Sequence, residues 1–249
     1  MARTRGSWSG IALLLLLLPS AAVALEPTLW FTDPEQLVAA GVPVNLGNHA
    51  ATRFVDWDDD GLLDVLVGGG DGYVYIVVNI GTATEPSFAA PQHVQAAGGF
   101  VRAGNGYTGA CFVDVTGDGL KDLLVAEGTL TPDQVRLYRN VGAPGAPSFG
   151  YYEWLMGPSQ PVRLPGDANG RLDVGDYDAD GLADLVSGEF DGYVSFLRNV
   201  GSETEPRFAA GVHIRAGGGE IHLPYNTHPR IFDVNQDGTA DLGCGYNWG

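Results

Sequence analysis

Short apolar runs bounded by glycine recur along the chain and give the first indication of its secondary structure. The runs Asp64–Gly68 (DVLVG) and Asp122–Ala126 (DLLVA) have the length and composition of buried strands. Two further runs, Tyr73–Val77 (YVYIV) and Tyr193–Leu197 (YVSFL), show the alternation that predicts a second strand. Helical periodicity is slight. The pattern therefore predicts an all-β chain built from many short strands.

A nine-residue acidic segment occurs four times and leads into these runs. The copies start 58, 62 and 57 residues apart, so one unit of about 60 residues recurs along the chain. A fixed period of this size predicts stacked blades or a solenoid. The copies are 56–64 (DWDDDGLLD), 114–122 (DVTGDGLKD), 176–184 (DYDADGLAD) and 233–241 (DVNQDGTAD).

The spacing of the acidic residues within each copy indicates a metal-binding loop. Side-chain oxygens at the first, third, fifth and ninth positions can converge on one hard cation, and such ligands in a flexible loop favour Ca²⁺ over Mg²⁺. A glycine follows the fifth position every time, where a sharp turn needs positive φ. The first and third loops carry carboxylates at all four of these positions, so we expect them to be the tighter sites.

The predicted calcium ligands share these loop positions, together with one backbone carbonyl near the end of each loop. The side-chain ligands are Asp56, Asp58, Asp60 and Asp64; Asp114, Thr116, Asp118 and Asp122; Asp176, Asp178, Asp180 and Asp184; and Asp233, Asn235, Asp237 and Asp241. The carbonyls are assigned to Leu62, Lys121, Leu182 and Thr239.

Two other interpretations of the loops need to be weighed. An EF-hand requires flanking helices and a Glu at position twelve, but the twelfth residues here are Val67, Val125, Ser187 and Cys244. A single Asp-Gly pair could simply form a hairpin turn. Four copies with the same placement of carboxylates favour calcium over this simpler interpretation.

The remainder of each unit predicts two more strands. An Asn-x-Gly turn is followed by Pro-x-Phe in three units, ending at Phe88, Phe149 and Phe208, and the Phe is expected to open the outer strand. Four antiparallel strands with the metal loop between the first two make one propeller blade. About four such units fit the chain, either as a small closed ring or as an arc of a larger propeller. An arc would leave open blade edges, which favour self-association.

Two segments carry a resemblance to a known family: FVDWDDDGLLDVLVGG (54–69) and DVGDYDADGLADLVSGEFDGYVSFLRNVGSETEPRF (173–208). Both resemble the FG-GAP and VCBS repeats, the calcium-loop blades also found in integrin alpha-subunit propellers. The similarity covers most of the chain after residue 50. It implies a secreted or surface β-propeller that binds calcium in its blade loops and serves adhesion, recognition or scaffolding.

The N-terminal segment and the charge bear on location and partners. Residues 1–24 have the features of a secretion signal: Arg3 and Arg5, an apolar run over 11–18, and a small-residue cleavage site at 22–24. The apolar run is shorter than a membrane span of roughly 20 residues. We expect 25–249 to be the mature repeat domain, secreted and without a transmembrane segment. The formal charge of −17 excludes nucleic acid as a partner.

Candidate ligand-binding residues lie outside the loops. Tyr151, Tyr152 and Trp154 occupy the longest connection between units, where rings could stack on a sugar or simply pack between blades. Glu220, His222 and His228 break the repeat pattern and could form a second site or a polar connection. We therefore expect a non-catalytic module that binds a protein or glycan ligand at an extracellular surface. The alternative is an enzyme, or an accessory module, acting on extracellular polysaccharide.

Two cysteines remain, Cys111 and Cys244, three residues before the second loop and three after the fourth. In a secreted chain a pair suggests one disulfide, but these residues are expected in strands of different blades. Both a bridge and two buried free thiols stay open from the sequence.

Overall fold

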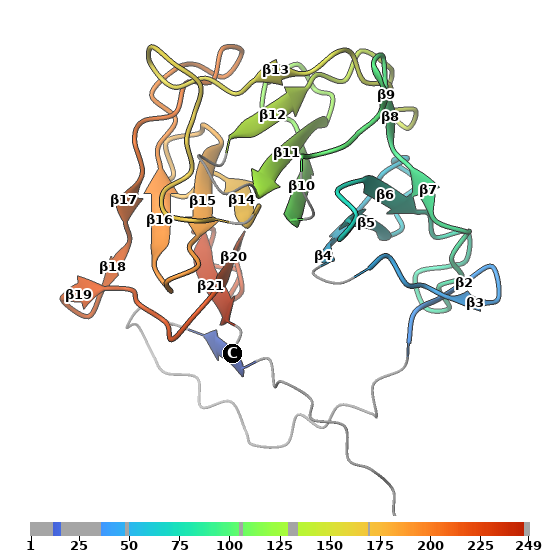
Figure 1. Cartoon of the computed structure of the whole chain (residues 1–249), viewed down its shortest axis with the longest axis horizontal. Coiled ribbons are helices and arrows are strands. Elements are labelled where there is room, and N and C mark those ends of the chain that lie inside the picture. The colour runs from blue at the N-terminus through green and yellow to red at the C-terminus, as the bar shows by residue number, and fades with distance from the viewer. Residues whose placement is uncertain are drawn as a thin grey trace, which may run out of the picture.

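The computed structural model of the chain describes residues 12–15, 36–47, 50–104, 107–128, 134–168 and 170–246. Within these ranges the regular elements are all strands, and they form a series of small antiparallel sheets arranged around a common centre (Figure 1). The predicted all-β class and the four-stranded blades are confirmed.

Each of the first three units is a four-stranded sheet whose strands follow chain order, with the acidic loop between the first and second strands. The first sheet contains β4 (Ala51–Val55), β5 (Asp64–Gly68), β6 (Val74–Val77) and β7 (Gln92–His93). The second contains β10 (Tyr107–Val113), β11 (Asp122–Gly128), β12 (Val135–Tyr138) and β13 (Glu153–Trp154). The third contains β14 (Leu172–Gly175), β15 (Asp184–Gly188), β16 (Val194–Leu197) and β17 (Val212–His213).

The fourth unit pairs β20 (Thr227–Phe232) with β21 (Asp241–Tyr246). A third strand, β1 (Ala12–Leu15), lies antiparallel on the other edge of β21. Strand β1 belongs to the segment expected to be a secretion signal. This edge of β21 is therefore unpaired only in a chain from which that segment has been removed. The rest of residues 1–24 lies outside the described residues.

Three two-stranded hairpins follow or precede these sheets, and two of them contact the sheet that comes next in the chain. The amide of Ala40 donates to the carbonyl of Phe88 (2.8 Å), and the amide of Ala97 donates to the carbonyl of Phe149 (2.9 Å). The Pro-x-Phe segment of the first and second units is thus held by the hairpin that precedes the unit in the chain. The hairpins are β2 (Val38–Ala39) with β3 (Val42–Pro43), β8 (Gln95–Ala96) with β9 (Gly99–Phe100), and β18 (Arg215–Ala216) with β19 (Gly219–Glu220).

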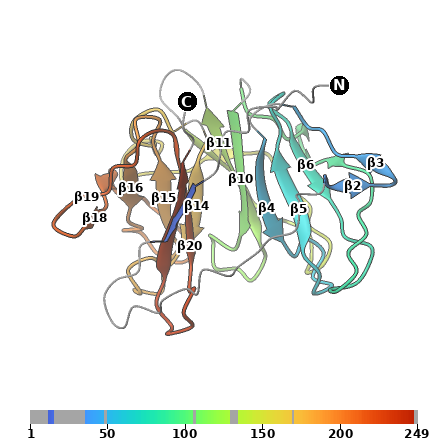
Figure 2. The ribbon, with the colours of Figure 1, turned by 90° about the horizontal axis from the view of Figure 1, so that it is seen from below.

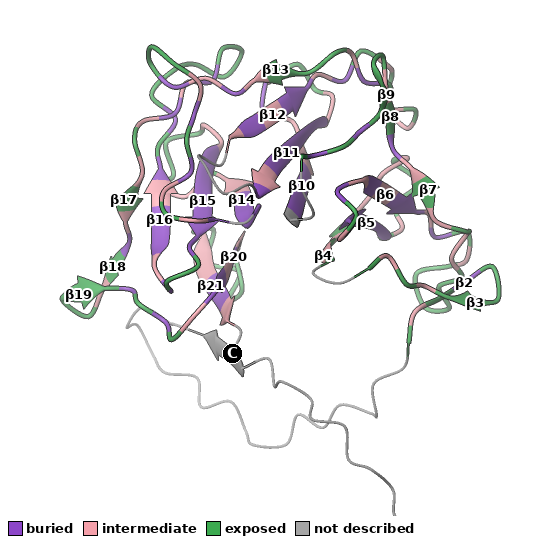
Figure 3. Ribbon diagram, viewed as in Figure 1, coloured by how far each residue is buried: buried purple, intermediate pink, exposed green. Residues whose placement is uncertain are grey.

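The hydrophobic core lies between neighbouring sheets. Leu66, Leu124 and Leu185, in the second strand of successive units, are fully buried, and burial concentrates in the central strands while the outer hairpins stay exposed (Figure 3). One apolar cluster joins the first and second units and another joins the second and third. Each fully buried leucine stabilises the fold by about 1.5–3 kcal/mol relative to exposure.

The units form an arc, which was the second of the two predicted arrangements. Strand β10 lies between β4 and β14 (Figures 1 and 2), and in the described residues no sheet closes on itself. One side chain nevertheless reaches from the last unit to the first, because Arg230 Nη2 donates to the carbonyl of Thr52 at 3.2 Å. Cys111 and Cys244 are both buried free thiols, which answers the question left open by the sequence.

Candidate metal loops and ligand pocket

The four acidic loops share one backbone conformation. The glycine at the sixth position has positive φ in every loop: +84° at Gly61, +87° at Gly119, +88° at Gly181 and +85° at Gly238. Each of these amides donates to the carboxylate of the first Asp, for example Gly181 to Asp176 Oδ2 at 2.9 Å. The predicted need for glycine is confirmed, since left-handed backbone costs a side chain about 1 kcal/mol or more.

The ninth residue of the loop anchors it to the sheet. Asp64 is fully buried, and it accepts hydrogen bonds from the amides of Trp57 (2.9 Å) and Asn79 (2.6 Å). Asp122 and Asp184 are equally buried and accept from the equivalent Asn amides. Burial raises the pKa of both carboxyls, although these hydrogen bonds oppose the rise.

The first loop fits a divalent cation. Carboxylate oxygens of Asp56, Asp58 and Asp64 all lie within 4.8 Å of one another. One oxygen of Asp56 and one of Asp58 are buried without any hydrogen-bond partner. Burial, followed by the charges of Asp60 and Asp64, raises the pKa of Asp58. Buried oxygen atoms that lack partners and repel each other are what a bound cation would satisfy.

The third loop holds a similar group, with one complication. Oxygens of Asp176, Asp178 and Asp184 also lie within 4.8 Å of one another. The guanidinium of Arg198, however, contacts Asp178 (2.7 Å) and Asp180 (2.8 Å). A cation that used both carboxylates would displace this arginine, so the two loops with carboxylates at all four ligand positions are not equivalent.

The second and fourth loops satisfy their polar atoms internally. The hydroxyl of Thr116 donates to Asp122 Oδ2 at 2.9 Å, and Asn235 Nδ2 donates to Asp237 at 2.9 Å. Thr116 and Asn235 stand at the third loop position, where the other two loops have Asp58 and Asp178. Neither the second nor the fourth loop forms a three-carboxylate group within the described residues.

Lys121 has a different position and role from the one assigned to it. It is the eighth residue of its loop, whereas Leu120 is the seventh, and the Lys121 carbonyl accepts a hydrogen bond from Asn140 Nδ2 at 3.0 Å. Its ammonium reaches the neighbouring unit and contacts Asp59 Oδ1 (2.6 Å) and the carbonyl of Asp56 (2.8 Å). This contact ties the first loop to the second, and the hydrogen bond from Lys121 is the main reason that the pKa of Asp59 is lowered.

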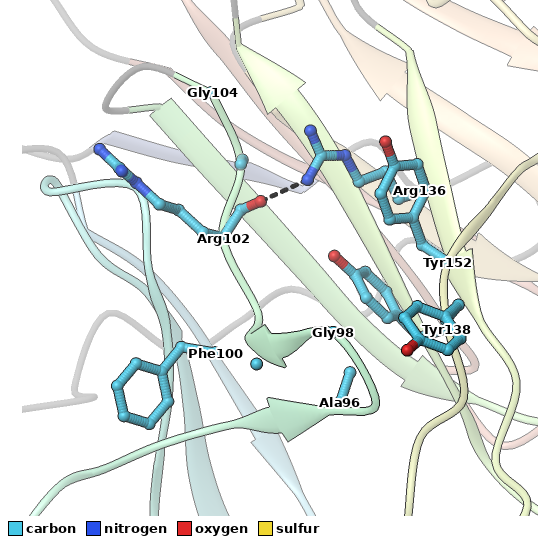
Figure 4. Close-up of a pocket in the computed structure, with 11 residues that line it drawn as sticks. Ala96, Gly98, Phe100, Arg102, Gly104, Arg136, Tyr138 and Tyr152 are labelled. Carbon is cyan, nitrogen blue, oxygen red and sulfur yellow. Dashed lines mark hydrogen bonds between the residues drawn. The ribbon is translucent and has the colours of Figure 1, made fainter.

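Two of the three predicted aromatic residues line a cavity of about 370 Å³ between the first and second units, which we call the Tyr151 pocket. Tyr151 is 77% exposed, and Tyr152 contacts Trp154 edge-on with ring centroids 5.3 Å apart. Figure 4 shows Tyr138, Tyr152 and Arg136 on one side of the pocket and Phe100 and Arg102 on the other. Trp154 is not part of this lining and instead lines a separate cavity of about 240 Å³.

Arg136 was missed by the sequence analysis, although it organises the pocket. Its guanidinium lies 4.4 Å from the centre of the Tyr152 ring and 5.6 Å from that of Trp154. It also forms an ion pair with Glu127 and donates to the carbonyl of Arg102 (2.5 Å). The register of β12 with β13, which pairs Arg136 with Trp154, is the signal that could have identified it.

The second set of candidates is only partly brought together. Glu220 Oε2 lies 3.2 Å from His213 Nδ1, and both His213 and His222 contact the Tyr193 ring. His228 lies on the inner strand β20, where burial, followed by the charges of Arg171 and Arg230, lowers its pKa to about 4. A single site formed by Glu220, His222 and His228 is therefore not what the structure shows.

Stacked four-stranded blades with an acidic loop after each inner strand define a repeat protein of the β-propeller class. The chain belongs to the FG-GAP-like repeat family, whose model matches residues 56–125, 114–187 and 176–244. It matches no curated protein. In the described part of the chain, no helix has the length and apolar character needed to cross a bilayer.

Proposed function

We propose that the chain is a secreted recognition module, stabilised by calcium in its acidic loops, that binds a glycan in the Tyr151 pocket. The observation that supports recognition most directly is that the exposed Tyr151 ring and the fixed guanidinium of Arg136 line the same cavity. Sugar rings stack on aromatic faces and form hydrogen bonds at the polar rim. Because Arg136 is already held by Glu127 and by a backbone carbonyl, little side-chain entropy is lost when a ligand binds.

The proposed calcium sites are the first and third loops. Asp56, Asp58 and Asp64 would hold the ion in the first loop, and bound calcium supplies positive charge that neutralises these carboxylates. Because only the folded chain presents the whole ligand set, binding stabilises the fold by mass action. The unpartnered oxygens of Asp56 and Asp58 support the first loop as the tighter site.

The two parts of the proposal are linked through the junction between the first two units. Asp59 of the first loop accepts hydrogen bonds from Lys121 (2.6 Å) and from the amide of Gly145 (2.7 Å), both in the second unit. The Tyr151 pocket is built across the same junction. Calcium in the first loop would therefore also hold the pocket in shape, and chelation would weaken glycan binding.

The test uses purified protein and a panel of immobilised neutral and acidic oligosaccharides, with calcium or with EDTA. We expect binding in calcium, weaker binding in EDTA, and loss of binding in Tyr151→Ala. Phe190→Ala is the matched control, because Phe190 is also an exposed ring but packs on Tyr225 outside the pocket. Equal binding by the Tyr151 variant and the wild type would refute the glycan site while leaving the calcium proposal intact.

The proposal contains no catalytic step. The alternative, an enzyme acting on polysaccharide, would draw on Glu220 in the cluster with His213. Release of new reducing ends from the same oligosaccharides, abolished by Glu220→Gln, would support the enzyme instead of the recognition module.

A further inference from the structure

One position of the repeat varies among the units, with Arg in two of them and Cys or Asp in the others, and it faces the common centre of the blades. It is the third residue before each acidic loop, which is Arg53, Cys111, Asp173 or Arg230 on the inner strands β4, β10, β14 and β20. All four line one cavity of about 430 Å³, which we call the axial cavity. Since each unit contributes its equivalent residue, the cavity lies where the four inner strands converge.

The charges in the axial cavity do not balance. Arg53 Nη1 lies 2.5 Å from Asp173 Oδ1, and the other oxygen of Asp173 accepts from the amide of Ile231 at 2.6 Å. Cys111 is neutral, because burial raises the pKa of its thiol to about 11. The set of one carboxylate and two guanidiniums therefore carries one net positive charge, although the whole chain carries −17.

Arg230 is the source of this excess. Its guanidinium donates only to backbone carbonyls, those of Pro229 (2.9 Å) and Thr52 (3.2 Å). No carboxylate in the described ranges lies within ion-pair distance of it. Burial and the positive charge of Arg53 lower the pKa of Arg230, and the charge of Asp173, which is already paired with Arg53, opposes this only in part. A partly buried charge that has no ion pair of its own is costly, and an arginine has five donors, of which these bonds use two.

The wall of the axial cavity is apolar. Phe54, which is 69% exposed, and Phe232 contribute rings, and Phe112 and Ile231 add further apolar surface. A ligand that satisfies both features has an anionic group for Arg230 and an apolar body for the phenylalanines. The flat, two-pronged guanidinium matches a carboxylate in particular.

We propose that the axial cavity binds an organic carboxylate with an apolar body, whose carboxylate pairs with Arg230. The site is separate from the acidic loops and from the Tyr151 pocket, so its test does not depend on the proposed function. Cys111 lies beside the site, with its thiol donating to the carbonyl of Leu172 at 3.8 Å, and takes no part in covalent chemistry.

Calorimetric titration of the purified full chain with benzoate, acetate, benzamide and inorganic phosphate tests the proposal. We expect one benzoate site, weaker binding of acetate because it lacks the apolar body, and no binding of the uncharged benzamide. No benzoate binding, or equal binding of benzamide, would overturn the proposal. Phosphate binding more tightly than benzoate would also overturn it, by showing a site for inorganic anions.

Two variants and a control locate the binding. Arg230→Gln should weaken benzoate binding by roughly 30-fold or more, as expected when one partner of a buried charge pair is lost. Arg215→Gln changes an exposed arginine on β18 and should leave the affinity unchanged. If Arg230→Gln fails to fold, Phe54→Ala decides the question, because it should remove the preference for benzoate over acetate. An unchanged preference would refute the axial site.

Discussion

Replacement of Asp58 by Asn in the first loop should change the stability of the protein in opposite directions with and without calcium. Oxygens of Asp56, Asp58 and Asp64 lie within 4.8 Å of one another, and two unit charges at about 5 Å repel by about 1 kcal/mol under water-like screening. Removing the Asp58 charge removes two such repulsions, with Asp56 and with Asp64, and therefore raises the free energy of unfolding by about 1–2 kcal/mol in EDTA. No hydrogen bond is lost at the unpartnered Asp58 oxygen.

In calcium the sign reverses. An ion present at 100 times its dissociation constant stabilises the fold by about 2.7 kcal/mol. If the loss of one carboxylate ligand weakens binding about 100-fold, the contribution of this site falls to about 0.4 kcal/mol at the same concentration. The variant should thus lose about 2.3 kcal/mol of calcium-dependent stability, or roughly 5–9 °C in Tm for a chain of this size.

Urea and thermal unfolding in EDTA and in calcium measure both effects. Asp59→Asn is the matched control, since Asp59 is the next residue but contacts Lys121 and Gly145 rather than the carboxylate group. It should lower stability by a similar amount in both conditions. If Asp58→Asn instead destabilises the protein in EDTA and leaves the calcium increment intact, the loop is a turn and not a metal site.

Two further predictions concern packing and pH. Gly68→Ala should lower the free energy of unfolding by about 3 kcal/mol or more, because its Cβ would lie 1.9 Å from the Thr108 carbonyl oxygen of the next unit. Gly219→Ala, which has open space around it, is the control in urea unfolding. Equal stabilities of the two variants would contradict the close approach of the units. His228 has a pKa of about 4 in the folded chain against about 6.5 unfolded, so the unfolded state binds the proton first. The free energy of unfolding should fall by at most about 3 kcal/mol as the pH drops from 6.5 to 4. In EDTA, this fall should be shallower in His228→Gln than in the wild type. Parallel plots of stability against pH for the two proteins would exclude His228 as the cause.

The acidic loops could be predicted from the sequence because everything that shapes them lies within nine consecutive residues. The turn at Gly61 and the placement of Asp56 and Asp58 need no information about the rest of the fold. The strand order within each unit could be predicted for the same reason. Short connections between alternating runs allow few ways to pair consecutive strands. The displaced assignment of Lys121 shows the limit of counting positions: the loop spacing cannot reveal that this side chain reaches across to Asp59.

The pocket and the axial cavity could not be predicted in the same way, because each is assembled from residues of different units. Phe100 and Arg136 face each other across a junction whose geometry depends on how the hairpin of one unit meets the next sheet. Arg53 and Asp173 are paired at 2.5 Å although they lie 120 residues apart. An alignment of the repeats places both residues at the same position, but it does not show that this position faces the centre.

A comparison of equivalent positions among the units separates the framework of the protein from its candidate binding sites. The loop glycine, the ninth-position Asp and the Phe of Pro-x-Phe recur, and in the first three units each makes the same structural contact. The third residue before each loop, which faces the centre, is Arg in two units, Cys in one and Asp in one. The equivalent hairpin position holds Phe100, Pro161 or Glu220. If the side chains at these variable positions only packed within the blades, the equivalent surroundings in each unit would favour the same residue. Their divergence within a constant framework is the reason to look for ligands at the hairpins and the axial cavity, and to assign the acidic loops to stability.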